Sequence, residues 1–545
     1  MKYALVFDLG TGSVKASLVS EDAKIMKSHV VTYETKYGDG GIREQRPTDW
    51  FEGIREATAI LLKDFHEKSS VVAIALSGHS LGVIAVDEKG NLLSETTPIW
   101  SDARATEQAE QFFQKVDYRQ WYETTGNGFP PHLYSVFKIM WYREKMPELY
   151  DQTAVFLGSK DYINACLTGQ LCTDQSYASG SGVYDLSRHA YREDYIDAAG
   201  LDASKFPVIL RSDEVVGTLK PSLAQAFGLS ESVVVVAGGV DNACMTLGAG
   251  CITNGSAYIS LGSSAWIAVC ADHPVVDFEK KIYTWEHCVD DMYIPSSGIF
   301  SCGTALEWVK NRMFPDLSLP EFDRLAATSP LGANGVTFCP VLSGGSSVDV
   351  SDKMKGSFMG LELGSTRADI ARGTLEGIAW DLLLAVEALE SRLDICEPIC
   401  AVGGGAKSEI WLNMYANILD KNIRSGAVLR DTAALGAAGL AFRGCGLWTG
   451  YEKIVEAQKN GTLFMKDVDT AWQYRKMRSR FELLCQQCAD YGLSSETLQK
   501  AYDTLEAYPD LLVRIGGHSR YFNEFDNDMK NKFIERFKVE EGAYS

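Results

Sequence analysis

A carboxylate and a cluster of glycine and hydroxyl residues lie close together near the start of the chain, within residues 7–17. Apolar runs flank the glycines on both sides, a pattern that predicts a β-hairpin. Its backbone N–H groups, hydroxyls and amine could hold an anion. The residues expected to contact phosphate are Gly10, Thr11, Gly12, Ser13 and Lys15. Asp8 ends the first strand, where a carboxylate can hold a hydrated divalent cation. The alternative is a hairpin without a ligand.

The same pattern recurs about half a chain later. Residues 259–264 repeat the spacing of residues 7–12, again between two apolar runs. Two similar domains facing each other would place one hairpin on each side of a polyphosphate. We expect Gly262, Ser263 and Ser264 to form this second phosphate loop. Because Ser260 stands where the first copy has Asp8, one metal-holding carboxylate is expected, on the first domain.

An aspartate follows the apolar run 233–237 after a pair of glycines. The segment reads Gly238-Gly239-Val240-Asp241-Asn242. A carboxylate placed just after a buried strand, where glycines keep the backbone slim, lies at an edge that often binds ligands. We therefore predict Asp241 as a general base and substrate contact, with Asn242 also beside the substrate. The alternative is a helix N-cap, a position that aspartate favours.

Polar groups next to aromatic ones mark a candidate substrate pocket. His79 and Ser80 follow the apolar run 71–76, and Trp100, Asp102 and Arg104 follow a shorter strand. An apolar wall beside hydrogen-bonding groups suits a small polyhydroxylated ligand. We predict all five as substrate contacts. For Asp102 and Arg104, a structural ion pair is an equal alternative.

Length, charge and composition bound the class of protein. The 545 residues exceed one hydrophobic core and imply two or three domains. No apolar run reaches the ~20 residues that span a bilayer, and Asp8 interrupts the apolar start too early for a signal peptide. The formal net charge of -20 argues against nucleic-acid or membrane partners. We expect a cytoplasmic protein whose 13 scattered cysteines are reduced.

Two later stretches complete the organisation. A triple glycine at 403–405 follows an apolar strand and precedes an expected helix at 409–419, where bare backbone suits a nucleotide. Residues 451–545 have a helical, charged pattern without a phosphate-loop motif. We expect this extension to pack on the second domain or in an oligomer, outside the active site. Its Cys485 and Cys488 are expected on the core face of a helix, not around a metal.

Together these motifs resemble the FGGY family of carbohydrate kinases over roughly residues 1–445. The matching segments are 8–15, 100–104, 238–242, 260–264, 356–376 and 403–408, with a weaker match at 138–141. Gly373 departs from the family pattern, and Leu133 and Lys145 fit it poorly. The resemblance implies an α/β fold with two actin/hexokinase-like (ribonuclease H-like) ATPase domains around a cleft. They would span 1–248 and 249–450, followed by the helical extension 451–545.

The resemblance also implies roles for individual residues. ATP and Mg2+ would be the cofactors, with Asp8 at the metal, Asp241 as the base and Trp100 lining the sugar pocket. The second-domain residues implied at the nucleotide are Gly262, Ser263, Ser264, Gly303, Gly404, Gly405, Ala406 and Asn413.

The predicted reaction is ATP-dependent phosphorylation of a sugar hydroxyl, most simply that of a ketopentose such as xylulose. Xylulokinases resemble one another in a Gln-Met-His-Gly and a Gly-Glu-Arg-x-Pro segment, whereas this chain has different residues at 79–82 and 344–348. Gluconate, a polyol or another ketose are therefore alternatives. An actin- or Hsp70-like ATPase and a non-catalytic sugar sensor are alternatives of other classes, and intact Asp8 and Asp241 argue against the sensor. The expected partners are sugar and ATP, with a possible homodimer.

Overall fold

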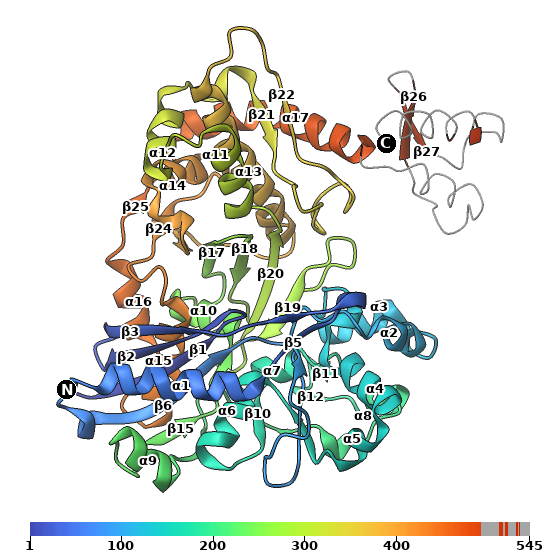
Figure 1. Cartoon of the computed structure of the whole chain (residues 1–545). Coiled ribbons are helices and arrows are strands. Elements are labelled where there is room, and N and C mark those ends of the chain that lie inside the picture. The colour runs from blue at the N-terminus through green and yellow to red at the C-terminus, as the bar shows by residue number, and fades with distance from the viewer. Residues whose placement is uncertain (492–511, 516–517, 522–529, 532–533, 535–545) are drawn as a thin grey trace.

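The computed structural model describes residues 1–491, 512–515, 518–521, 530, 531 and 534. Figure 1 shows two lobes, one built mainly from the first half of the chain and the other mainly from the second half. Each lobe contains a seven-stranded sheet. This architecture confirms the predicted pair of α/β domains.

The first sheet has the strand order β14-β15-β6-β1-β2-β3, and β16 also pairs with β6. β1 and β2 form the predicted antiparallel hairpin, while β6 runs parallel to β1 on its other side. β1 and β6 are nearly continuous apolar runs because they are buried on both faces. The strands are β1 (Tyr3–Leu9), β2 (Ser13–Ser20), β3 (Ile25–Thr32), β6 (Val71–Gly78), β14 (Val215–Thr218), β15 (Val234–Val236) and β16 (Gly239–Val240).

The second sheet repeats this plan with the order β19-β20-β18-β17-β23-β24-β25. β17 and β18 form an antiparallel hairpin, β23 runs parallel to β17, and β24 runs parallel to β23. The register places Ser260 opposite Trp266, where the first hairpin has Asp8 opposite Lys15. The strands are β17 (Ala257–Leu261), β18 (Ala265–Val269), β19 (Tyr283–Glu286), β20 (Tyr293–Ile299), β23 (Ile399–Val402), β24 (Ile423–Ser425) and β25 (Leu463–Phe464).

Two short helices pack against each other where the lobes meet. α10 (Asp241–Gly248) and α15 (Thr432–Gly444) approach so closely that a Cβ on Gly248 would lie 1.8 Å from the carbonyl oxygen of Thr432. A Cβ on Gly436 would lie 1.9 Å from the carbonyl oxygen of Cys244, so only glycine fits at either contact. α15 also packs against β1 and β6. The chain therefore returns to the first sheet within residues 249–450, which the sequence assigned to the second domain.

Two longer helices cover the second sheet. α13 (Arg367–Glu390) packs against β18 and β20, and α14 (Glu409–Ile418) packs against α13 and β24. α13 begins with a capping box in which Thr366 accepts from the backbone N–H of Asp369, and the Asp369 side chain accepts from the N–H of Thr366. α14 begins at the predicted place after the triple glycine.

The described helices of the extension within residues 451–491 pack mainly on the second lobe, which is one of the two predicted arrangements. α16 (Glu452–Lys459) leads to β25, and α17 (Val468–Tyr491) lies against α14 and β21 (Thr337–Cys339). Tyr474 anchors α17, since its hydroxyl donates to Glu376 Oε1 at 2.7 Å and accepts from Arg372 Nη2 at 3.0 Å. Cys485 and Cys488 are buried on the core face of α17, as predicted.

The predicted helical extension also contains short strands in two places. β25 is an edge strand of the second sheet, and β26 (Leu512–Ile515) pairs with β27 (His518–Tyr521) in an antiparallel hairpin. Strands this short give no periodicity that distinguishes them from the ends of helices. The rest of the predicted helical segment beyond Tyr491 falls outside the described residues, apart from a few isolated positions. Among the described helices, none is long and apolar enough to cross a bilayer.

Candidate active site

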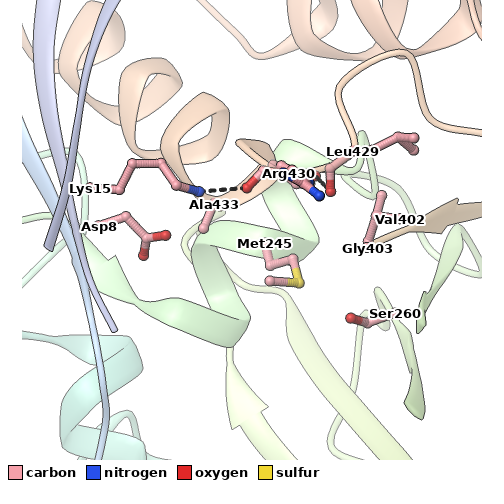
Figure 2. A pocket seen from close by; sticks show the side chains of 10 residues that line it. Asp8, Lys15, Met245, Ser260, Val402, Gly403, Leu429, Arg430 and Ala433 are labelled. Carbon is pink, nitrogen blue, oxygen red and sulfur yellow. Dashed lines mark hydrogen bonds between the residues drawn. The ribbon is translucent and has the colours of Figure 1, made fainter. Parts of the chain in front are cut away.

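A cavity of about 310 Å³ lies between the two hairpins and brings residues from both lobes together. Figure 2 shows Asp8 and Lys15 on one side of it and Ser260, Val402 and Gly403 on the other. The full lining consists of Asp8, Lys15, Met245, Ser260, Val402, Gly403, Leu429, Arg430, Thr432 and Ala433. The predicted arrangement of one hairpin on each side of a shared site is therefore present in the structure.

The first phosphate loop is held tightly to the body of its domain. The N–H of Gly10 donates to the carbonyl of Ser13 at 2.9 Å, which closes the turn. The Tyr33 hydroxyl donates to the carbonyl of Gly10, and Gln45 Nε2 donates to that of Thr11. These contacts fix the shape of the turn, and among the described residues no backbone hydrogen bond uses the N–H groups of Thr11 and Gly12, which suits the predicted contact with an anion.

Lys15 already has anionic and carbonyl partners in the other half of the chain. Its Nζ lies 3.2 Å from Asp431 Oδ1 and donates to the carbonyl of Arg430 at 2.7 Å. These contacts join the first hairpin to the loop that precedes α15 (Figure 2). Lys15 thus lines the cavity as predicted, but it is paired across the two lobes.

Arg430 is a cation at the site that sequence reasoning missed. It lines the cavity between the hairpins and also a larger neighbouring cavity. Within the described part of the chain, its guanidinium makes no hydrogen bond or ion pair. No motif surrounds Arg430. The sequence feature that could have indicated this residue is its position just before the small-residue helix α15.

The neighbouring cavity, of about 680 Å³, has the size of a small-molecule site and includes residues predicted to contact the nucleotide. It contains the predicted Gly262, Ser263, Gly303, Gly404 and Gly405. The N–H of Gly303 donates to the carbonyl of Gly262 at 2.9 Å, and a Cβ on Gly303 would lie 2.5 Å from that oxygen. The helix that begins at Gly303, α11 (Gly303–Met313), is thereby pinned to the second hairpin.

Three predicted nucleotide contacts do not line this cavity. Ser264 is half-buried, Ala406 is buried, and the Asn413 side-chain oxygen accepts from Asn417 one turn along α14. Leu319 and Pro320 line it instead, from α12 (Leu319–Thr328). The sequence missed them because α12 comes from a segment without a nucleotide motif.

Asp241 is the first residue of α10, directly after β16 at the edge of the first sheet. Its Oδ1 accepts from the N–H of Asn242 at 2.8 Å, and the helix has no side-chain N-cap, so the capping alternative is not realised. Burial raises the pKa of Asp241 to about 7, and the negative charge of Asp8 adds to this shift. The side-chain oxygen of Asn242 is buried and has no hydrogen-bond partner in the described structure, which suits a substrate contact.

A buried polar network that sequence reasoning missed holds the backbone before Asp241. The N–H of Val240 donates to Ser176 Oγ at 2.9 Å, and Ser176 Oγ donates to Asp174 Oδ2 at 2.5 Å. Asp174 Oδ1 lies 2.8 Å from Lys160 Nζ, which also contacts Asp161. All four network side chains are buried. They form a rigid support for the base, assembled from segments far apart in sequence.

Trp100 lies where a wall of the substrate pocket was predicted. Its indole Nε1 donates to Thr11 Oγ1 of the first phosphate loop at 3.0 Å, and 40% of the side chain is exposed. It therefore joins the predicted sugar wall to the phosphate loop.

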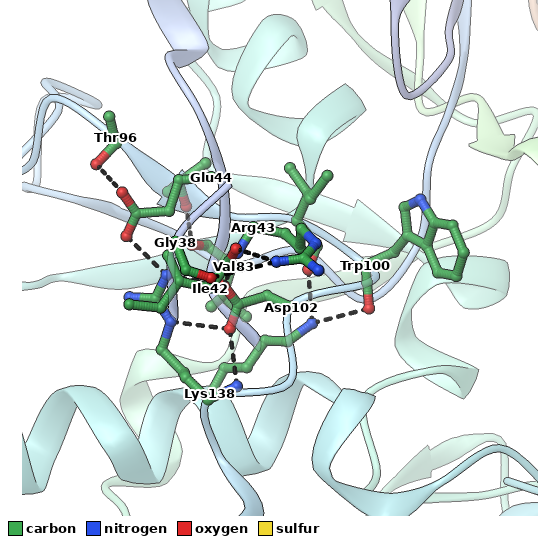
Figure 3. A network of polar contacts seen from close by, with 12 residues as sticks. Gly38, Ile42, Arg43, Glu44, Val83, Thr96, Trp100, Asp102 and Lys138 are labelled. Carbon is green, nitrogen blue, oxygen red and sulfur yellow. Dashed lines mark hydrogen bonds and ion pairs between the residues drawn. The ribbon is translucent and has the colours of Figure 1, made fainter. Parts of the chain in front are cut away.

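Asp102 and Arg104 form the structural ion pair that was the alternative to sugar binding (Figure 3). Arg104 Nε and Nη2 lie 2.8 Å from the two carboxylate oxygens of Asp102. Asp102 also accepts from the N–H of Arg43, and Arg104 also contacts Glu44 at 2.7 Å. These contacts use both Asp102 oxygens and the Nε and Nη2 groups of Arg104, which favours the structural alternative for this pair.

The turn after β6 is largely buried. His79 is 2% exposed and packs edge-to-face on Trp50, and burial lowers its pKa to about 4. Both of its ring nitrogens lack partners in the described structure. Ser80 is half-buried and Leu81 is buried. Of the two predicted substrate contacts here, Ser80 is the more accessible.

Comparison with known proteins matches this architecture to a family. Residues 3–248 match the model of the N-terminal domain of the FGGY family of carbohydrate kinases, and residues 257–445 match that of its C-terminal domain. The xylulose kinase of Staphylococcus epidermidis is 31% identical over 454 residues, 83% of this chain and 90% of that enzyme.

Solved structures share the fold. The ligand-bound xylulose kinase from Lactobacillus acidophilus matches with a TM-score of 0.83 at 23% identity, covering 90% of this chain and 99% of that one. The gluconate kinase from the same organism matches with a TM-score of 0.81 at 24% identity and the same coverage. Both likenesses concern the fold alone.

Proposed function

Since this chain belongs to the FGGY family of carbohydrate kinases, we propose that the sugar hydroxyl it phosphorylates with ATP is that of a ketopentose, with xylulose the first candidate. The observation that carries the site assignment is Asp241, a carboxylate with a pKa near 7 at the start of α10, the helix whose Met245 lines the cavity between the two hairpins; Asp241 does not itself line that cavity, but it is close enough to Asp8 for that charge to raise its pKa. The xylulose kinases among the relatives support the choice of sugar.

In the proposed reaction, Asp241 accepts the proton of the sugar hydroxyl. The hydroxyl oxygen forms a bond to the γ-phosphorus while the bond between that phosphorus and the β,γ-bridging oxygen breaks, and ADP leaves. A carboxylate whose pKa lies near the working pH is deprotonated in much of the enzyme and still binds a proton strongly enough to act as a base. The amide groups of both hairpins would stabilise charge on the transferred group.

Asp8 fits the role of holding Mg2+. Its carboxylate lines the cavity, and Ser77 Oγ donates to Oδ1 at 2.9 Å, which leaves Oδ2 for a hydrated cation. Among the described residues, no cluster of three or more histidines, cysteines, aspartates or glutamates could hold a metal. One carboxylate together with substrate phosphates is a usual setting for Mg2+. When bound, Mg2+ would neutralise charge on the phosphates.

The structure favours a neutral sugar over gluconate. Arg104, the cation that would face a gluconate carboxylate, is occupied by Asp102 and Glu44. Leu81 presents an apolar group where xylulokinases have a polar one, and a Cβ on Gly180 would touch both Leu81 and Trp285. ATP as the donor places the proposed reaction in the cytoplasm; a homodimer stays a prediction.

A panel of sugars tests the proposal. ADP release is measured with xylulose, ribulose, a hexulose, gluconate, erythritol and glycerol, and without sugar. We expect a ketopentose to give the highest kcat/KM. If gluconate or glycerol exceeds every ketose by about 10-fold, or ~1.4 kcal/mol, the ketopentose assignment fails while the family activity stands. Sugar-independent ADP release would support an ATPase, and no release would support a sensor.

A further inference from the structure

Lys138 is a buried amine with a complete set of backbone acceptors. It lies in α4 (Ser135–Lys145) and is 0% exposed. Its Nζ donates to the carbonyls of Ile99 at 2.8 Å, Leu81 at 3.0 Å and Trp100 at 3.2 Å. An ammonium group has three N–H donors, so these three carbonyls use all of them.

The three carbonyls belong to two turns that the chain forms separately. Leu81 lies between β6 and β7 (Ile84–Val86), and Ile99 and Trp100 follow β8 (Thr97–Pro98). Figure 3 shows the Lys138 amine reaching the carbonyl of Trp100, while the indole ring of Trp100 points away from the network. One side chain therefore fixes the backbone under both segments of the predicted sugar wall.

Both turns need contacts from neighbouring groups to keep their backbone conformation. Leu81 has φ of 62°, a left-handed conformation that a side chain of its size rarely adopts without support. Trp100 is partly exposed and its own side chain reaches Thr11 of the phosphate loop. A shift of either turn would move the wall relative to the phosphoryl group, and misplacements of about 1 Å can cost ~100-fold in rate.

The surroundings of Lys138 act in opposite directions on the charge of its amine. Burial lowers its pKa to about 7, the Asp102 carboxylate opposes that shift, and Arg104 adds to it. The neutral amine has two N–H groups and would leave one carbonyl without a donor. The Asp102–Arg104 pair therefore lies close enough to Lys138 for both of its charges to shift the pKa of the amine.

We propose that Lys138 is a positioning residue for the acceptor sugar: its ammonium clamps the turns at Leu81 and Trp100 so that Ser80 and the Trp100 ring hold the sugar against the phosphate loop. The proposal rests on the proposed function, because it assigns these turns to the sugar. It predicts a defect that is specific to the sugar and leaves the nucleotide unaffected.

The test compares Lys138→Met with the wild type on the best sugar of the panel. We expect KM for the sugar to rise at least ~10-fold, with KM for ATP changed less than ~3-fold. Lys205→Met is the matched control, because it removes another amine that holds a backbone carbonyl, that of Thr153. We expect that control to leave both KM values unchanged. Equal rises of the two KM values in Lys138→Met, or an unchanged sugar KM, would overturn the proposal.

Chemical rescue keeps the test decisive if Lys138→Met is unstable. In Lys138→Ala, added n-propylammonium should lower the sugar KM towards the wild-type value, whereas n-propanol of the same length should not. Equal rescue by both would mean that only the packing of the side chain matters, which contradicts the clamp.

Amide hydrogen exchange separates this proposal from the proposed function. In Lys138→Met we expect faster exchange at 80–83 and 99–101 and unchanged exchange at 239–243. If no sugar supports turnover of the wild type, the proposed function fails, and unchanged exchange at both turns would then also refute the clamp. If a sugar is used but its KM is insensitive to Lys138, only the clamp fails.

Discussion

The hairpins β1–β2 and β17–β18 occupy equivalent places in their sheets. They differ in the residues that stand at one pair of opposite positions. In the first, Asp8 lies opposite Lys15, and in the second, Ser260 lies opposite Trp266. Both turns have the glycines and hydroxyls of a phosphate loop. The repeated fold therefore preserves the backbone that can bind an anion, while the charged groups are confined to one copy.

The difference extends to what surrounds each hairpin. The first lies beside Asp241, whose support is a buried network of charged side chains. The second lies beside the cavity of about 680 Å³, whose lining combines glycines and apolar side chains with charged ones such as Glu307, Arg324 and Lys407. Its Trp266 donates to Tyr258. We infer a division of labour, in which the first lobe supplies the base and the metal-holding carboxylate and the second supplies the nucleotide cavity.

Removing the base should have the largest effect on this division. Asp241→Asn keeps the shape of the side chain but cannot accept a proton, so we expect kcat to fall 100-fold or more, the typical worth of general base catalysis. Nucleotide affinity, measured by calorimetry with ADP, should be nearly unchanged because the adenosine cavity lies in the other lobe. Near-normal turnover would remove Asp241 from the mechanism.

The two hairpins can be compared directly by truncating equivalent residues. We expect Asp8→Ala to lower kcat/KM for Mg-ATP about 100-fold, since metal stabilisation of phosphate charge is worth several kcal/mol. Ser260→Ala should cost at most ~5-fold, the worth of one neutral hydrogen bond. The measurement is turnover as a function of Mg2+ concentration. Equal effects of the two substitutions would show that charge is not confined to the first hairpin.

The pH dependence tests whether the two carboxylates of the first lobe interact. Since burial and Asp8 raise the pKa of Asp241 to about 7, the base is protonated below that pH, and kcat should fall about 10-fold per unit below 7. In Asp8→Ala the acid limb should move to lower pH. The raised pKa also means that the folded state loses stability as pH rises through 7, so Asp241→Asn should raise Tm at pH 8 more than at pH 5. If the acid limb keeps its position in Asp8→Ala, the Asp8 and Asp241 carboxylates do not interact.

The sequence predicted those parts of the site that lie within one short segment. The hairpins, the triple glycine and Asp241 each combine a strand end with local glycines, so their positions follow from pattern alone. Arg430 and the packing of α15 against the first sheet could not be predicted, because they depend on how the chain returns from one lobe to the other. The structural role of Asp102 could not be predicted either. It depends on the N–H of Arg43, which donates to Asp102, and on Glu44, which contacts the partner Arg104.

The smallest expected effects concern Lys15 and Trp266, the residues that lie opposite Asp8 and Ser260 in the two hairpins. Lys15 bridges to Asp431 and to the carbonyl of Arg430, so a bound triphosphate would compete with these partners for the same amine. We expect Lys15→Met to raise KM for ATP about 10-fold, as expected for one charge-assisted hydrogen bond, with little change in the sugar KM. Trp266→Phe, at the equivalent position, should change KM for ATP less than ~3-fold, because only the hydrogen bond to Tyr258 is lost.

Asp431→Asn completes this comparison, because it releases Lys15 without removing its charge. If the bridge competes with phosphate, this variant should bind ATP at least as tightly as the wild type while Lys15→Met binds more weakly. If both variants weaken ATP binding equally, the bridge itself holds the site in its binding geometry. In that case, Lys15 would act by joining the two lobes. Arg430, which lines the same cavity, would then be the cation available to contact the phosphates.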